Sequence, residues 1–169
     1  MEIDALSEQM GKINSDKVKR FVLLALMEAD AKFWTAPCSS TGKYHPPEDQ
    51  GAGGLIRHLI KGTAVVEQFA RRAQFSPLEQ DLAIASYLLH DICKDGLPPW
   101  GEYTDYTHGL IAYNWLQQFR LDDEYAKQTI LDGVRYHMAP WCYAVSPFRK
   151  EGQFTKDEMM LNLNELTRA

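Results

Sequence analysis

Apolar residues recur at intervals of three and four through most of this sequence, and no other feature restricts its fold as strongly. In the first such segment, residues 16–34, the apolar positions include Val18, Phe21 and Val22. This spacing places apolar side chains on one face of an α-helix, whereas the alternation typical of strands is not found over any useful length. We therefore predict an all-α fold. The expected helices cover about 16–34, 55–74, a segment that begins at 77, 107–119, 122–136 and a segment that begins at 155.

Capping signals support several of these boundaries. Ser76, Pro77 and Glu79 form a capping-box sequence with a first-turn proline, and Thr107 can cap the helix that follows it. A second capping box begins at Thr155. No internal repeat of the length found in solenoids is present. We expect the 169 residues to form one compact bundle of about six helices, a single domain over residues 1–169.

Two loops interrupt the helical pattern. Residues 36–54 are rich in proline, glycine and serine, and residues 100–106 are aromatic and acidic. A long connection without regular structure is usually functional, so we expect the loop 36–54 to form a wall of the site. Aromatic side chains beside a phosphate site either stack on a base or pack as a lid. Those in question are Trp100, Tyr103, Tyr106, Trp141 and Tyr143.

Charge and cysteine content narrow the classes of function. The net charge is −5 and no block of lysine or arginine occurs, which argues against a protein that binds a nucleic-acid duplex by neutralising its phosphates. Cys38, Cys93 and Cys142 are widely spaced, so we expect neither a disulfide framework nor a cysteine-based zinc site. The sequence shows no membrane-spanning run and no signal-peptide layout, and we expect a cytoplasmic protein without a membrane partner.

The five histidines are the most informative residues. His58, His90, His108 and His137 each fall within or at an end of a different predicted helix. Asp91 follows His90 at the end of an apolar helix, where a carboxylate is costly unless it is paired or holds a metal ion. One histidine alone is more often an ordinary core or surface residue. Four together predict a metal site built from facing helices, and imidazole with carboxylate suits zinc, iron, manganese or nickel.

These residues resemble the HD-domain superfamily of metal-dependent phosphohydrolases. The segment 53–58 is similar to the "GGL…H" motif of one branch, 90–95 is similar to its "HDIGK" motif, and 135–137 is similar to its late histidine motif. Residues 37–46 resemble the loop that precedes the first motif in members that act on nucleotides or nucleic-acid ends. The resemblance covers about 36–140 and implies an HD-domain-like helical fold.

The resemblance also implies two divalent ions. His58, His90 and Asp91 would hold the first ion, and Asp91 would bridge to a second ion held by His108 and His137. Two ions about 3.5–4 Å apart can activate a hydroxide and neutralise phosphoryl oxygens. The sequence does not distinguish manganese, iron, nickel, zinc and magnesium.

A later aspartate completes the shell of the first ion in this family, and the only aspartate after His137 is Asp157. With Thr155 as the cap, Asp157 falls in the first turn of a helix, where a carboxylate usually just stabilises the helix dipole. We keep Asp157 as a sixth candidate ligand. The alternatives are that another group or a water replaces the family's aspartate, or that this aspartate would follow Ala169.

Further candidates concern the substrate. Lys94 can hold a phosphate as a point charge or be a solvated lysine at a helix end, and Asp95 can accept a proton or merely terminate the helix. Together with Asp91, these two are the candidate catalytic residues. The candidates for substrate binding are Lys43, His45, Arg57 and Arg135.

The activity implied by the resemblance is hydrolysis of a phosphoester or phosphodiester through a metal-activated hydroxide. Its substrate would be a nucleotide or a short single-stranded nucleic acid, and oligomerisation stays open. Two alternatives remain at this point. One is a di-iron oxygenase of the HD type, and the other is a degenerate HD domain that binds nucleotides without turnover.

Overall fold

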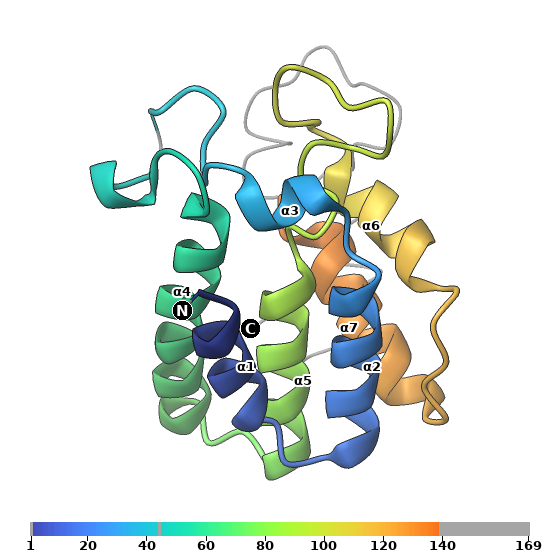
Figure 1. Cartoon of the computed structure of the whole chain (residues 1–169). Coiled ribbons are helices and arrows are strands. Elements are labelled where there is room, and N and C mark those ends of the chain that lie inside the picture. Colours follow the sequence, from blue (N-terminus) through green and yellow to red (C-terminus); the bar gives the residue numbers. More distant parts are fainter. Residues whose placement is uncertain (1, 44, 139–169) are drawn as a thin grey trace, which may run out of the picture.

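The computed structural model describes residues 2–43 and 45–138, which form helices joined by loops (Figure 1). No strand is found among these residues, so the prediction of an all-α fold is confirmed. Within the described part of the chain, no helix is both long and apolar enough to cross a membrane. The helices are α1 (Glu2–Gly11), α2 (Asp16–Met27), α3 (Ala31–Thr35), the 3₁₀-helix η1 (Pro47–Asp49), α4 (Gly54–Arg72), α5 (Pro77–Leu89), α6 (His108–Leu116) and α7 (Glu124–Tyr136).

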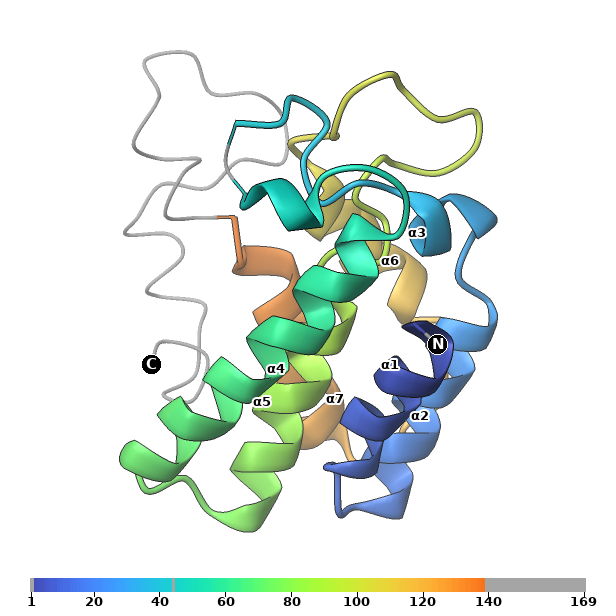
Figure 2. The ribbon, with the colours of Figure 1, turned by 60° about the vertical axis from the view of Figure 1, so that its left-hand side comes forward.

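Helix α5 is the central helix of the bundle. It packs against α2, α4 and α7, as the two views of the ribbon show (Figures 1 and 2). Its residues Leu82, Ala85 and Leu88 are fully buried, and burial of one large aliphatic side chain contributes about 1.5–3 kcal/mol. Because other helices surround α5, the residues that follow its last turn emerge in the middle of one end of the bundle. Those residues are His90 and Asp91.

Both long loops lie at this same end of the bundle (Figure 1). The loop before α4 and the loop before α6 are joined by hydrogen bonds. Thr104 donates its backbone N–H to Ser40 Oγ at 3.3 Å, and the two hydroxyls lie 3.2 Å apart. Lys32 Nζ donates to the Gly101 carbonyl oxygen at 3.1 Å. The predicted loop wall is therefore connected to the aromatic loop that follows residue 96.

The prediction of one continuous helix over 16–34 is wrong. Helix α2 ends at Met27, and the separate helix α3 begins at Ala31. Between them, the Asp30 carboxylate accepts a hydrogen bond of 2.7 Å from the Lys32 backbone N–H. Aspartate favours such a cap over the interior of a helix, because its side chain competes for backbone hydrogen bonds. The break turns α3 across the start of α4, against which it packs.

Helix α1 is a second difference, since no helix was predicted before residue 16. It packs against α2 and α4, and Leu6 and Gln9 are buried in it. The helical signal in this short segment is the spacing of its apolar residues Ile3, Leu6 and Met10, at intervals of three and four. Residues 2–43 and 45–138 thus contain seven α-helices, whereas five of the about six predicted helices fall within these residues.

The predicted caps are only partly correct. Ser76 and Glu79 form the reciprocal capping box at the start of α5, which confirms that boundary. Thr107 stands at the N-cap position of α6, but its side chain caps nothing. Its hydroxyl instead donates to Asp105 Oδ1 at 2.7 Å, and α6 ends at Leu116, before the predicted end.

Some sequence predictions concern residues outside the described part of the chain. These are the helix expected from residue 155, the candidate ligand Asp157 and the aromatic residues Trp141 and Tyr143.

Candidate metal centre

The structure brings together five of the six predicted metal ligands. His58 comes from α4, His108 is the first residue of α6, and His137 directly follows α7. His90 and Asp91 follow α5. Potential ligand atoms lie within 4.8 Å of one another in two groups, His58–His90–Asp91 and Asp91–His108–His137. The four histidines thus surround one end of the central helix, and both groups include Asp91.

The two oxygens of the Asp91 carboxylate face different neighbours. Oδ1 lies 3.0 Å from His108 Nε2 and 3.4 Å from His137 Nε2. Oδ2 lies 3.5 Å from His90 Nε2 and 2.6 Å from Lys94 Nζ. Since only 3% of Asp91 is exposed, these neighbours replace water around it. A carboxylate whose two oxygens face different sets of histidines can bind one ion through each oxygen.

Three of the imidazoles are held in the same manner by the backbone. His90 Nδ1 lies 2.6 Å from the Tyr87 carbonyl oxygen, and His137 Nδ1 lies 2.6 Å from that of Val134. His108 Nδ1 makes the same contact with the Asp105 carbonyl oxygen. A carbonyl carries no hydrogen, so Nδ1 is the donor each time. In a neutral ring Nε2 then carries the lone pair, which is the arrangement that metal-ligating histidines adopt.

The nitrogens His108 Nε2 and His137 Nε2 face each other at 2.8 Å, beside Asp91 Oδ1. Because both Nδ1 atoms act as donors, each neutral ring would present its Nε2 lone pair. These two lone pairs and the Asp91 carboxylate oxygen would then face one another. Such a set of acceptors is stabilised by a cation, and nitrogen with carboxylate ligands suits a divalent transition metal. The residues present therefore fit the metal site predicted from the sequence.

The charge states of the central residues agree with this arrangement. Burial by itself would raise the pKa of Asp91, but the Lys94 ammonium, 2.6 Å from Oδ2, favours the charged form, and the pKa lies well below its usual value. Burial lowers the pKa of His90 to about 3. At physiological pH the site therefore combines a charged carboxylate with a neutral imidazole, and these are the forms that bind metals.

Tyr87 is a neighbour of the site that the sequence reasoning missed. Its hydroxyl lies 3.1 Å from His58 Nε2, and its ring centre lies 4.9 Å from that of His90. Gly62 makes room for it, because a Cβ at that position would lie 1.7 Å from Tyr87 Oη. The available signal was the position of Tyr87 one turn before Asp91 on an inward-facing helix.

The two candidate catalytic residues next to Asp91 differ in their surroundings. Lys94 Nζ binds Asp91 Oδ2 directly, within the cluster. Asp95 faces away from this contact, and its Oδ2 lies 3.3 Å from Lys32 Nζ. A pocket between α3 and the segment after α5 is lined by Asp91, Lys94 and Asp95 as well as by Lys32, Phe33 and Trp100. Of the five candidate ligands that the structure brings together, Asp91 lines this pocket.

The candidate substrate-binding residues also occupy different places. His45 packs edge-on against His58, with ring centres 5.0 Å apart, whereas Lys43 is exposed in the same loop. Arg57 donates to the Glu48, Gln50 and Ala52 carbonyl oxygens and so supports the loop. The Arg135 guanidinium lies over the ring of Tyr113, with its carbon atom 4.8 Å from the ring centre.

Cys38 is the second residue that the sequence reasoning missed. It is fully buried, and its sulfur forms a third group of potential ligands with His45 and His58. Burial raises the pKa of the Cys38 thiol to about 12. The signal in the sequence was its position in the loop that already contained His45.

Substitution of Gly109 by alanine is expected to separate His108 from His137. At Gly109, α6 crosses α7 so closely that a Cβ would lie 2.7 Å from the Arg135 carbonyl oxygen and 3.0 Å from that of Val134. Carbonyl oxygens of the helix backbone cannot change rotamer as a side chain can, so the two helices must move apart. This lowers the free energy of unfolding by about 1–3 kcal/mol. Urea unfolding and calorimetric titration with Mn²⁺ would measure the two effects.

Gly11→Ala is the matched control, because a Cβ at Gly11 meets nothing within 4 Å. This variant should bind Mn²⁺ as the unmodified chain does. Unchanged Mn²⁺ affinity in Gly109→Ala would show that the close helix contact is not needed to position the histidines.

Comparison with known proteins gives one match. The family model described as the HD domain matches residues 55–167, about two thirds of the chain. Searches of curated proteins and of solved structures return no match. The matched range includes His58, His90, Asp91, His108 and His137.

Proposed function

The chain belongs to the HD domain family, and from this membership we propose that it is a metal-dependent phosphohydrolase that acts on a nucleotide or on the end of a nucleic acid. Proteins of this family bind divalent metals and are in general hydrolases. The substrate, the number of ions and the roles of individual residues are part of the proposal.

The observation that carries the proposal is the pair of facing nitrogens beside the Asp91 carboxylate. His108 Nε2 and His137 Nε2 lie 2.8 Å apart, and Asp91 Oδ1 lies 3.0 Å from the first of them. We assign one divalent ion to these three residues and a second to His58, His90 and the other oxygen of Asp91. When bound, such ions lower the pKa of a water and neutralise charge on phosphoryl oxygens.

The residues of the chain would then perform the remaining tasks. Asp91 would hold the two ions at a fixed separation, because its buried carboxylate belongs to both groups of ligands. Lys94 Nζ contacts Asp91 Oδ2, and both residues line the pocket beside α3. Its ammonium is therefore placed to bind a phosphate oxygen of a substrate in that pocket. Trp100, which lines the same pocket, offers a face for stacking on a base.

Metal analysis combined with a hydrolysis assay tests the proposal. The purified chain would be stripped with a chelator, reloaded with Mn²⁺, Ni²⁺, Zn²⁺, Fe²⁺ or Mg²⁺, and assayed on bis(p-nitrophenyl) phosphate and on a panel of nucleotides and short single strands. We expect hydrolysis that is lost on chelation and restored by at least one metal. Iron-dependent consumption of dioxygen would instead indicate an oxygenase, and nucleotide binding without turnover under any metal would indicate a binding domain.

A further inference from the structure

We infer that Cys38, His45 and His58 form an additional metal position, with a thiolate as one of its ligands, at the edge of the histidine cluster. It differs from the two groups described above because it includes sulfur and lacks Asp91. Metal binding at this position does not depend on the hydrolytic activity proposed above.

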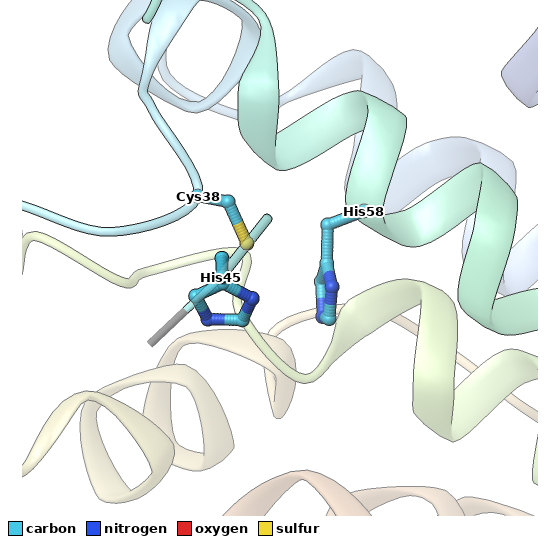
Figure 3. Close-up of side chains that lie close together, drawn as sticks. All are labelled: Cys38, His45 and His58. Atoms are coloured by element: carbon cyan, nitrogen blue, oxygen red, sulfur yellow. The ribbon is translucent and has the colours of Figure 1, made fainter. Parts of the chain in front are cut away.

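The three side chains converge from two parts of the chain. Cys38 and His45 belong to the loop before α4, and His58 lies within α4 (Figure 3). The sulfur of Cys38 points toward the two rings, and the potential ligand atoms lie within 4.8 Å of one another. Since the side chains already converge, only small movements would bring them to the shorter spacing that one ion requires.

Backbone contacts hold Cys38 in this orientation. Its N–H donates to the Asp49 carbonyl oxygen at 3.0 Å. Gly54 lies directly against this hydrogen bond, and only a residue without a Cβ fits there. A Cβ at this position would lie 1.8 Å from the Asp49 oxygen and 2.9 Å from the Cys38 nitrogen. Two residues earlier in the loop, the Ala36 carbonyl accepts from the Leu55 N–H at 3.1 Å. The thiol is therefore fixed against the first turn of α4, one turn before His58.

The loop that bears His45 is anchored in a similar way. Gln50 donates its side-chain amide to the His45 carbonyl oxygen at 2.8 Å. Lys61 binds the buried Asp49 carboxylate at 2.7 Å. Because the loop is held on α4 at several points, His45 and Cys38 do not need to be ordered by the ion, and this lowers the cost of binding.

The donor set defines the class of ion. One thiolate and two imidazoles are typical of zinc and of other borderline ions such as Co²⁺, whereas Mg²⁺ prefers oxygen ligands. The bound ion would displace the proton of the Cys38 thiol, which is released to the solvent. Three protein ligands leave one position for a water or a substrate atom, as in catalytic rather than structural zinc sites. His58 also belongs to the group with His90 and Asp91, and a neutral imidazole has only one nitrogen lone pair with which to bind an ion. Occupancy of the Cys38 position therefore competes with that group for His58.

Cobalt substitution tests the inference through a readout that is independent of activity. Co²⁺ added to the metal-free chain is expected to give a sulfur-to-cobalt charge-transfer band in the near ultraviolet. Cys38→Ser should abolish the band, since serine keeps the size of the side chain but removes the thiolate. The matched control is Cys93→Ser, because Cys93 is equally free and buried but belongs to none of the potential metal groups found among the described residues.

Two further variants separate this position from the rest of the centre. His137→Ala should keep the charge-transfer band, while His45→Ala should weaken Co²⁺ affinity at the thiolate position at least about tenfold. His45 is partly exposed, so its truncation leaves the core intact. Absence of the band in the unmodified chain, its persistence in Cys38→Ser or its loss in Cys93→Ser would each overturn the inference.

Discussion

Substitution of Asp91 by asparagine is expected to lower metal-dependent hydrolysis at least about 1,000-fold, with loss of both ions that we assign to the centre. The carboxylate supplies a ligand to each metal group, and asparagine keeps its shape but removes its charge. Electrostatic stabilisation in a water-poor site is the largest single contribution to many enzymatic rates, so loss of the central charge has a large effect. Metal content by mass spectrometry and turnover of bis(p-nitrophenyl) phosphate would measure the change.

Asp122→Asn is the matched control for this experiment. Asp122 is exposed and pairs with Arg120 rather than with the cluster, so the variant should keep its ions and lose less than about tenfold in activity. Thermal unfolding of both variants would separate loss of metal from loss of fold. Full metal content and turnover in Asp91→Asn would rule out the centre that we describe.

Truncation of His137 to alanine is expected to remove one ion per chain and to lower turnover about 100-fold. His137 and His108 are the nitrogen ligands on one side of Asp91, and a single imidazole with a carboxylate oxygen is too few ligands to retain a transition metal at micromolar concentration. His137 suits this test better than the fully buried His108. It follows the last turn of α7, and 17% of its side chain is exposed, so its removal leaves a smaller cavity.

His58→Ala provides the counterpart, because it leaves the Asp91–His108–His137 group untouched. It should retain the ion at that group and lose the other one. Metal analysis should show one ion per chain in each variant and none in the variant that combines the two substitutions. Two ions per chain in His137→Ala would contradict the assignment of His137 as a ligand.

The fold could be predicted from local patterns where those patterns are strong. The capping box at Ser76 and the apolar spacing of the following helix correctly predicted α5, and α7 lies within the helix predicted over 122–136. The break at Asp30 was not predicted, because a run of apolar positions continues across it. Whether Asp30 caps a new helix or lies within a longer one depends on the packing of α3 against α4, which is a long-range contact.

In the candidate site, too, local motifs could be predicted from the sequence and long-range contacts could not. The spacing of the histidines and their resemblance to a family pointed to His58, His90, Asp91, His108 and His137, since each lies in a motif of a few residues. The third potential metal group was not foreseen. Cys38 is separated from His58 by a loop of irregular structure, and its contact with the two rings follows from the backbone bond to Asp49.

By itself, the sequence determined the all-α class and the boundaries of helices such as α4 and α7, and it indicated the residues that we assign as imidazole and carboxylate ligands, because these depend on neighbours within one or two helical turns. Only the tertiary structure decided how the donors are shared. Asp91 divides its oxygens between two groups because α5 ends among α4, α6 and α7. His58 lies between Cys38 and His90 because the loop before α4 is bonded to the first turn of that helix. Such contacts join residues far apart in the chain, and they form only when the helices pack.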